Sequence, residues 1–158
     1  MALLNIVKEG DATLAKVCRP VTEITPRIKT LLDDMKETLE DANGAGLAAP
    51  QVGILRRICV VDLGDEVVEL INPEIIAAEG EQQDVEGCLS VPNVWGITSR
   101  PAKVTVKALN RDGDEIIVEG EELNARCLCH EIDHLDGHLF TEKVVRFLTD
   151  EELKELRD

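Results

Sequence analysis

All three histidines of this 158-residue chain lie close together, and two of them flank a glutamate in the pattern His130-Glu131-x-x-His134. On a helix, positions i and i+4 are about 40° apart around the axis and about 6 Å apart along it, so both imidazoles can reach one metal ion. Glu131 lies beside that face and can approach a water molecule at the metal without being a ligand. The pattern therefore predicts a central metal-binding helix.

Capping signals predict three helices. Thr25 as N-cap with Pro26 at the first helical position begins one helix. Gly137 is suited to the left-handed cap that ends the helix of the histidine motif. Thr149 and Glu152 form a capping box at the start of a third, acidic helix. The expected helices cover residues 25–43, about 121–135 and about 149–158.

Short β-rich runs occupy much of the remaining chain, and a turn of sequence Asn110-Arg111-Asp112-Gly113 predicts a hairpin. No regular alternation of strand and helix is visible, which favours an α+β fold of mixed or antiparallel short strands around the motif helix. Because no linker or repeat divides the chain, we expect residues 1–158 to form a single domain. The expected strands are 57–62, 67–72, 75–81, 103–110 and 115–118.

Charge and cysteine content narrow the class of protein. The formal net charge of −15 repels phosphate backbones and anionic membranes, and no apolar run approaches the roughly 20 residues of a membrane span. No basic-then-apolar leader is visible, so we expect a soluble protein of the reducing cytoplasm. The odd number of cysteines fits a disulfide framework poorly; they are Cys18, Cys59, Cys88, Cys127 and Cys129.

Two imidazoles leave a catalytic metal one protein ligand short. His138 falls just past the predicted helix cap and should point away from the other two, so we expect a solvated or capping role for it. The third ligand is therefore expected upstream, as a carboxylate or a thiolate. Cys88, in the segment Glu86-Gly87-Cys88-Leu89-Ser90, offers a thiolate on a Gly-containing turn, although a lone cysteine is more often a buried core thiol.

A third segment, Gly44-Ala45-Gly46-Leu47-Ala48-Ala49-Pro50-Gln51, has small residues that permit close backbone approach, followed by an amide side chain. In this order, the three segments resemble the signature of the peptide deformylases: Gly-x-Gly-x-Ala-Ala-x-Gln, Glu-Gly-Cys-Leu-Ser and His-Glu-x-Asp-His. The resemblance runs from about Ile6 to the Phe140 region and is to the compact form of the family.

The resemblance implies that Cys88, His130 and His134 hold the metal and leave a fourth position for water. From the ligand types alone, zinc would be expected. The resemblance instead implies Fe(II) in the cell, in a site that Ni, Co or Zn can also occupy. The implied reaction removes the N-formyl group from the initiator methionine of nascent polypeptides and releases formate.

The resemblance also implies roles around the reacting group. Glu131 would take a proton from water and pass it to the leaving nitrogen, and the Gln51 amide and the Leu89 backbone N–H would donate to the developing oxyanion. Ala45 and Gly46 would pair their backbone with the extended substrate. For the pocket that takes the methionine side chain, the expected lining residues are Leu123 and Cys127, for which a plain core role is equally open.

Three further residues near the motifs, Glu86, Arg100 and Trp95, have two open readings each. Glu86 and Arg100 could form an ion pair that steadies the Cys88 loop, or an ordinary surface pair. Trp95 could flank the substrate groove or simply pack. Cys129 stands where the family usually has Gln, and we expect it to be a packed thiol and not a ligand.

The expected partners are N-formylmethionyl nascent peptides, with a monomer favoured. In relatives a C-terminal helix can contact the ribosome, but the acidic residues of 150–158 are unsuited to RNA. Any ribosome contact should therefore be transient and involve no direct nucleic-acid recognition. Two alternatives stay open at this point: a zinc endopeptidase with the same histidine motif, and a non-catalytic metal-binding module in which Cys88, Cys127 or Cys129 closes a structural site.

Overall fold

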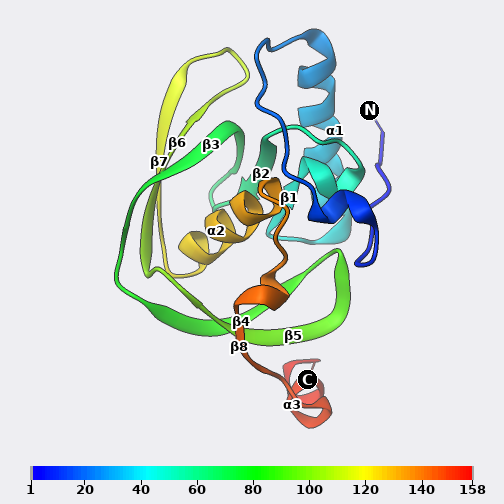
Figure 1. The fold of residues 1–158 in the computed structure, drawn as a ribbon, viewed down its shortest axis with the longest axis vertical. Coiled ribbons are helices and arrows are strands. Elements are labelled where there is room, and N and C mark those ends of the chain that lie inside the picture. Colours follow the sequence, from blue (N-terminus) through cyan, green and yellow to red (C-terminus); the bar gives the residue numbers. More distant parts are fainter. Residues whose placement is uncertain (1, 158) are drawn as a thin grey trace.

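The protein is described by a computed structural model that covers residues 2–157 (Figure 1). Over these residues the strands form a five-stranded sheet in the order β1-β2-β3-β6-β7 and a three-stranded sheet in the order β4-β5-β8, with every strand pair antiparallel. The α-helices are α1 (Pro26–Ala42), α2 (Leu123–Leu135) and α3 (Asp150–Arg157). The strands are β1 (Gly46–Ala48), β2 (Ile58–Asp62), β3 (Val67–Glu79), β4 (Gln82–Cys88), β5 (Val91–Arg100), β6 (Lys103–Leu109), β7 (Glu115–Glu121) and β8 (Val144–Phe147).

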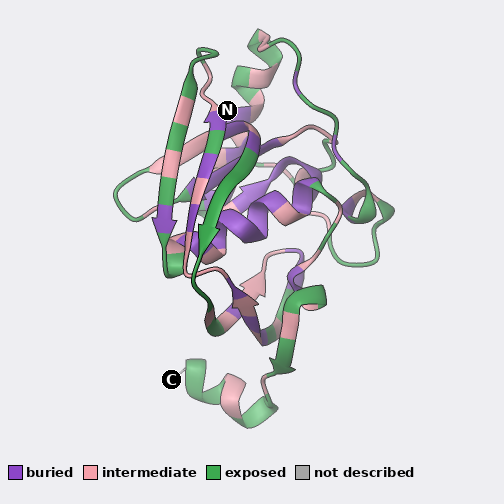
Figure 2. Cartoon of the chain, turned by 60° about the vertical axis from the view of Figure 1, so that its left-hand side comes forward, coloured by how far each residue is buried: buried purple, intermediate pink, exposed green. Residues whose placement is uncertain are grey.

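Helix α2 lies at the centre of this arrangement, with the two sheets around it, and is buried along most of its length (Figures 1 and 2). Its apolar residues recur every three or four positions and pack against β2, β6 and β7 in one core cluster. The polar residues of the histidine motif occupy the remaining surface of the helix and are also buried. The predicted α+β class, with antiparallel strands around the motif helix, is confirmed. The apolar positions are Ala125, Leu128, Ile132 and Leu135.

The helix ends predicted from capping residues are confirmed, whereas the motif helix begins at Leu123 and not at about 121, because β7 extends to Glu121. The Thr25 hydroxyl accepts a hydrogen bond from the Ile28 N–H at 3.3 Å, and Thr149 and Glu152 exchange the two bonds of a capping box. Gly137 follows α2 with φ +82°, and a Cβ there would lie 2.7 Å from the Ala15 carbonyl oxygen, so both backbone conformation and space require glycine. The predicted C-terminal helix is α3, whose last expected residue, Asp158, lies outside the described residues.

Several strands differ from the sequence-based expectation. The two runs predicted at 67–72 and 75–81 form one long strand, β3. Asn72 adopts φ +52° at a register shift, and its side chain bonds both the N–H and the carbonyl of Val21 at 2.8 Å. These bonds stabilise a left-handed residue inside the strand. The strands β1, β4, β5 and β8 were not expected.

The second sheet and α3 lie below α2 in Figure 1, and α3 is the peripheral element. None of the helices described within residues 2–157 is long and apolar enough to cross a membrane. The functional residues predicted from the sequence lie where α2, β1 and the end of β4 meet. The fold therefore matters for function chiefly through the way in which it brings β4 and β1 onto α2.

Candidate metal centre

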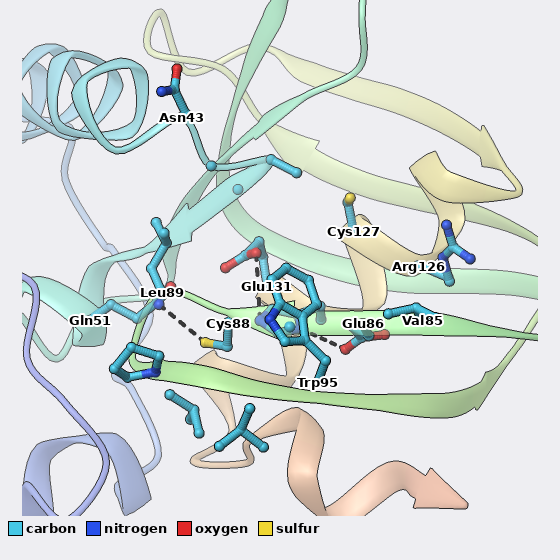
Figure 3. A pocket seen from close by; sticks show the side chains of 18 of the residues that line it. Asn43, Gln51, Val85, Glu86, Cys88, Leu89, Trp95, Arg126, Cys127 and Glu131 are labelled. Atoms are coloured by element: carbon cyan, nitrogen blue, oxygen red, sulfur yellow. Dashed lines mark hydrogen bonds and ion pairs between the residues drawn. The ribbon is translucent and has the colours of Figure 1, made fainter. Parts of the chain in front are cut away.

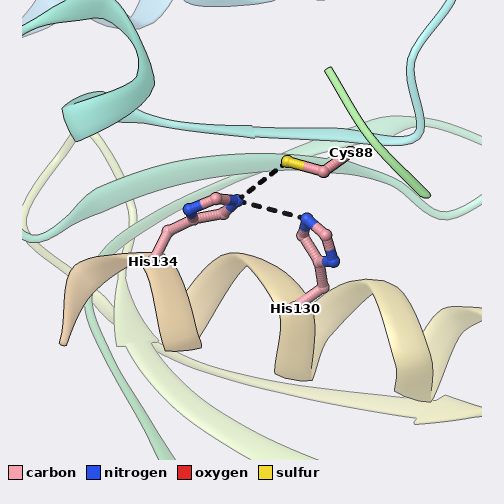
Figure 4. Close-up of side chains that lie close together, drawn as sticks. All are labelled: Cys88, His130 and His134. Carbon is pink, nitrogen blue, oxygen red and sulfur yellow. Dashed lines mark hydrogen bonds between the residues drawn. The ribbon is translucent and has the colours of Figure 1, made fainter. Parts of the chain in front are cut away.

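Three potential ligand atoms meet between α2 and the end of β4 (Figure 4). The Nε2 atoms of His130 and His134 lie 3.2 Å apart, and Cys88 Sγ lies 3.4 Å from His134 Nε2. All three ligand atoms lie within 4.8 Å of one another, although Cys88 is 46 residues from His134 in the sequence. Among the described residues, this is the group of His, Cys and carboxylate side chains placed to hold a metal ion.

The spacing of these atoms fits a metal ion. Tetrahedral ligands at about 2.0 Å for nitrogen and about 2.3 Å for sulfur stand roughly 3.3 Å apart (N to N) and roughly 3.5 Å apart (N to S). The distances of 3.2 Å and 3.4 Å between the same atom types are close to both values. Burial lowers the pKa of His134, so its imidazole is neutral and has a lone pair to offer. The donor set of two imidazoles and a thiolate suits a divalent first-row metal.

His130 is oriented by Glu86, whose Oε2 lies 2.6 Å from His130 Nδ1. An imidazole that donates its Nδ1–H to a carboxylate leaves Nε2 free as a ligand and becomes more basic. Burial alone would lower the pKa of His130, but the Glu131 carboxylate and contacts with Cys88 and Glu86 raise it. These negative groups around one imidazole favour a bound cation.

Glu86 is in turn held by a buried network. Arg100 Nη2 lies 2.7 Å from Glu86 Oε2, and the Thr98 hydroxyl donates to Oε1 at 2.8 Å. Arg100 also contacts Asp133 on α2, with Nη1 and Oδ2 2.5 Å apart. Although burial works to raise it, bonds from His130 and Arg100 hold the pKa of Glu86 at about 2. The Glu86–Arg100 pair is thus buried and not a surface pair, and the link from Glu86 to His130 is one that sequence reasoning missed.

Glu131 is buried beside the three ligand residues, with 4% of its surface exposed, and its Oε2 lies 4.0 Å from His130 Nε2. Within the described residues its Oε1 has no hydrogen-bond partner. Burial raises the pKa of the Glu131 carboxyl to about 7. A carboxyl group in this range can both accept and donate a proton near neutral pH.

Gln51 lies beside Cys88 (Figure 3). Its Oε1 accepts a hydrogen bond from the Ala48 N–H at 2.9 Å, which fixes the orientation of the amide. The Nε2 group consequently faces Ser90 Oγ at 3.1 Å and Cys88 Sγ at 3.6 Å. Leu89 follows Cys88 in the turn between β4 and β5. The structure thus places the Gln51 amide and Leu89 next to the candidate metal ligand.

A cavity of about 440 Å³ opens beside the metal centre. Its walls include all the residues for which a substrate contact was predicted, namely Ala45, Gly46, Leu123 and Cys127. Leu123 is 56% exposed at the rim, whereas Cys127 is 8% exposed. Trp95 also lines the cavity and stacks over Gly87, where a Cβ would lie 2.6 Å from the ring. Arg126 is a further lining residue that sequence reasoning missed.

Two residues near the motif lie outside the ligand group, as expected. His138 is exposed and pairs with Glu142 at 3.2 Å. Cys129 is 4% exposed in the core cluster that surrounds α2, and burial raises the pKa of its thiol to about 11. Neither Cys129 nor Cys127 belongs to the ligand group found among the described residues. This observation does not favour a structural site closed by four protein ligands.

Comparison with known proteins gives a consistent result. The sequence model of one family, Polypeptide deformylase, matches residues 3–149. The chain is 60% identical to the peptide deformylase of Acetivibrio thermocellus, over all of this chain and 93% of that protein. It is 59% identical to that of Agathobacter rectalis, over 95% of each chain.

Solved structures agree with the sequence comparisons. A peptide deformylase from Thermotoga maritima superimposes with a TM-score of 0.89 at 37% identity, covering 91% of this chain and 99% of the other. A peptide deformylase from Legionella pneumophila gives a TM-score of 0.87 at 41% identity, covering 99% of this chain and 92% of the other. The similarity therefore extends over the whole arrangement of α2, β1 and β4.

Proposed function

Because the chain belongs to the peptide deformylase family, whose members are metal-dependent hydrolases that remove the N-formyl group from nascent polypeptides, we propose that Cys88, His130 and His134 hold its catalytic metal. The supporting observation is the convergence of their ligand atoms, within 4.8 Å of one another, at the wall of the cavity beside buried Glu131. When bound, the metal supplies a Lewis acid that lowers the pKa of water and polarises the formyl carbonyl.

Glu131 moves the proton. Its carboxylate takes a proton from the attacking water and delivers it to the nitrogen that leaves with the deformylated peptide. A pKa of about 7 suits both steps, and burial keeps the carboxylate away from bulk solvent. Because its Oε1 has no partner among the described residues, that oxygen is available for water or substrate.

Gln51 and Leu89 stabilise the oxyanion that develops on the formyl oxygen. The Gln51 amide is aimed toward Cys88 by the bond that its Oε1 accepts from the Ala48 N–H. A donor held in place before the reaction stabilises developing charge without reorganising, and losing one such donor costs about 3 kcal/mol of the barrier. The Leu89 backbone N–H is the second proposed donor.

The substrate binds as an extended strand. The backbone of Ala45 and Gly46, at the start of β1, pairs with the peptide, and the cavity beside Leu123 and Cys127 takes the methionine side chain. Both lining side chains offer apolar surface, which suits a thioether.

The proposed setting is that of a bacterial-type cytoplasmic enzyme. Fe(II) is the proposed metal in the cell, with Ni, Co and Zn as alternatives that the His₂Cys donor set also accepts. Residues 1–158 act as one catalytic domain and a monomer, with formylmethionyl nascent peptides as partners. The acidic helix α3 contributes to a transient ribosome contact at most, without nucleic-acid recognition.

These roles can be tested by assaying anaerobically prepared protein for formate release from a formyl-Met peptide and for activity on its acetylated analogue. We expect formate release from the formyl peptide only, and metal analysis of the active protein to find Fe(II). Glu131→Gln keeps the shape of the side chain but cannot carry the proton, so it should abolish formate release while the bound metal is retained. Activity in Glu131→Gln, or internal cleavage of a blocked peptide by the wild type, would contradict the proposal.

A further inference from the structure

Three contacts join β4 to α2 at regular intervals. They link Asp84 to Arg126 (2.7 Å), Glu86 to His130 (2.6 Å) and Cys88 to His134 (3.4 Å). Two residues along a strand advance about 6.6 Å, and four residues along a helix advance about 6 Å. The same face of β4 and one stripe of α2 therefore stay in register over three successive contacts. The second and third contacts hold the metal centre, and the first has no part in the roles proposed above.

This first contact anchors an arginine in the cavity wall. Arg126 lines the cavity and its side chain is only 11% exposed, whereas the Asp84 side chain is 61% exposed. Asp84 thus holds the guanidinium from the solvent side. An arginine anchored by its charged end presents its aliphatic stem to apolar surroundings. Figure 3 shows Arg126 beside Cys127 and Val85, at the opposite end of the cavity from Gln51.

We infer that Arg126, fixed by Asp84, is a specificity-determining residue that limits the length of side chain the cavity accepts at the formylated residue. The inference rests on the proposed function, because it assigns the cavity to the methionine side chain. Arg126 precedes His130 by about one helical turn, so the two lie about 6 Å apart along the axis. This span suits an unbranched side chain such as that of methionine.

A bulkier side chain would have to displace Arg126. The next lining residue along α2 toward solvent, Leu123, is 56% exposed, so Arg126 is the better buried of these two side chains in the cavity wall. Displacing it would separate the guanidinium from Asp84 and leave a charge without its partner at the cavity rim. Discrimination by the fit of an apolar side chain is typically about 10-fold to 200-fold.

The test compares kcat/KM for two formyl peptides that differ only in the first residue, methionine or phenylalanine. Arg126→Ala should raise the phenylalanine-to-methionine ratio about tenfold. Arg126→Met, which keeps an unbranched side chain, should leave the ratio within about twofold of the wild type. Asp84→Asn frees the guanidinium from an exposed anchor and should raise the ratio about threefold.

Arg146→Ala serves as a matched control, because Arg146 forms an exposed ion pair with Glu152 on β8 and α3. It should not change the ratio. An unchanged ratio in Arg126→Ala, with both substrates losing activity together, would show a structural role only. If Arg126→Ala does not fold, an unchanged ratio in Asp84→Asn overturns the inference. A wild-type protein that releases no formate from either peptide would instead contradict the proposed function.

Binding provides a second measurement. Trp95 is the only tryptophan of the chain and lines the cavity, so its fluorescence reports occupancy. Titration of the metal-loaded protein with unformylated peptides that begin with methionine or phenylalanine should show a smaller difference in dissociation constant for Arg126→Ala than for the wild type. Equal differences in the two proteins would contradict the assignment.

Discussion

Gly46 lies directly against the carboxylate of Glu131: a Cβ at Gly46 would stand 2.5 Å from Oε2 and 2.7 Å from Cγ. Such distances are shorter than any side chain can occupy, so the proposed proton carrier keeps its position only because β1 has glycine there. The glycine in this segment thus positions a residue that lies 85 positions later in the printed sequence.

Gly46→Ala should therefore displace the Glu131 carboxylate and lower kcat. A misplacement of about 1 Å typically costs about 100-fold. Metal content should be unchanged, because the three atoms nearest to the added methyl group all belong to Glu131 and none to a ligand residue. Steady-state kinetics and metal analysis check both expectations. Gly64→Ala is a matched control, since Gly64 has φ +99° and open space around its Cα, so it should lose about 1 kcal/mol of stability but no activity.

Glu86→Gln should weaken metal binding about tenfold, because the amide is a poorer acceptor for the Nδ1–H of His130 and makes Nε2 a weaker ligand. Competition with a chelator measures the affinity. Asp133→Asn removes the charge that Asp133 presents to Arg100 but leaves the bond between Glu86 and His130 in place. Its effect on the metal affinity should therefore be smaller. Equal losses of affinity in both variants would mean that the whole network, and not the bond to His130, sets the affinity.

Metal removal should destabilise the wild type but not Cys88→Ala. The ligands come from β4 and α2, so a bound ion stabilises the folded state that joins them. A ligand at about 100 times its dissociation constant contributes about 2.7 kcal/mol. Chemical unfolding with and without chelator measures this contribution. If chelation destabilises Cys88→Ala as much as the wild type, the thiolate is not a ligand.

Arg111→Gln should lower stability at neutral pH but not at acid pH. Arg111 joins Glu69 on β3 to Asp33 on α1, and these bonds lower the pKa of both carboxyls. A carboxyl whose folded pKa lies below its unfolded value, about 4.3 for Glu, stabilises the fold fully above that value and loses the contribution as pH falls through the folded pKa.

Urea unfolding of both proteins tests this pH dependence. At pH 7 the free energy of unfolding of the wild type should exceed that of Arg111→Gln by about 1 kcal/mol, because only the wild type has the ion pair with Glu69. This difference in free energy should shrink as the pH falls below about 4. Lys29→Gln removes the same charge from an exposed position of α1, so its effect should not depend on pH. A difference for Arg111→Gln that persists at acid pH would contradict the assignment.

Local signals were sufficient where one short segment determines the structure. Thr25-Pro26, Gly137 and the Thr149 capping box placed the helix ends correctly, because each acts on backbone within a few residues. The spacing of His130 and His134 likewise placed two of the proposed ligands on one face of a helix, since i and i+4 positions lie together on any α-helix.

Long-range contacts explain what the sequence did not predict. Neither β4 nor β5 was predicted as a strand, and within this segment only residues 86–90 were expected to form a glycine-containing turn. In the structure Gly96 forms part of β5 because Val144 of β8 packs over it, where a Cβ would lie 2.7 Å from Val144 Cγ2. The bond from Glu86 to His130 joins residues 44 apart, and the pair of Asp84 and Arg126 also depends on the packing of β4 on α2.

The common register of β4 and α2 limits how this chain can evolve. Inserting one residue between Asp84 and Cys88 would turn one of these side chains to the opposite face of the strand. Deleting one residue from α2 between Arg126 and His134 would rotate part of the stripe by about 100°. Insertions and deletions in these two segments would therefore break the contacts between β4 and α2, so during evolution the segments can change only by substitution. The hairpin turn at 110–113 carries no such restriction and is where insertions can accumulate.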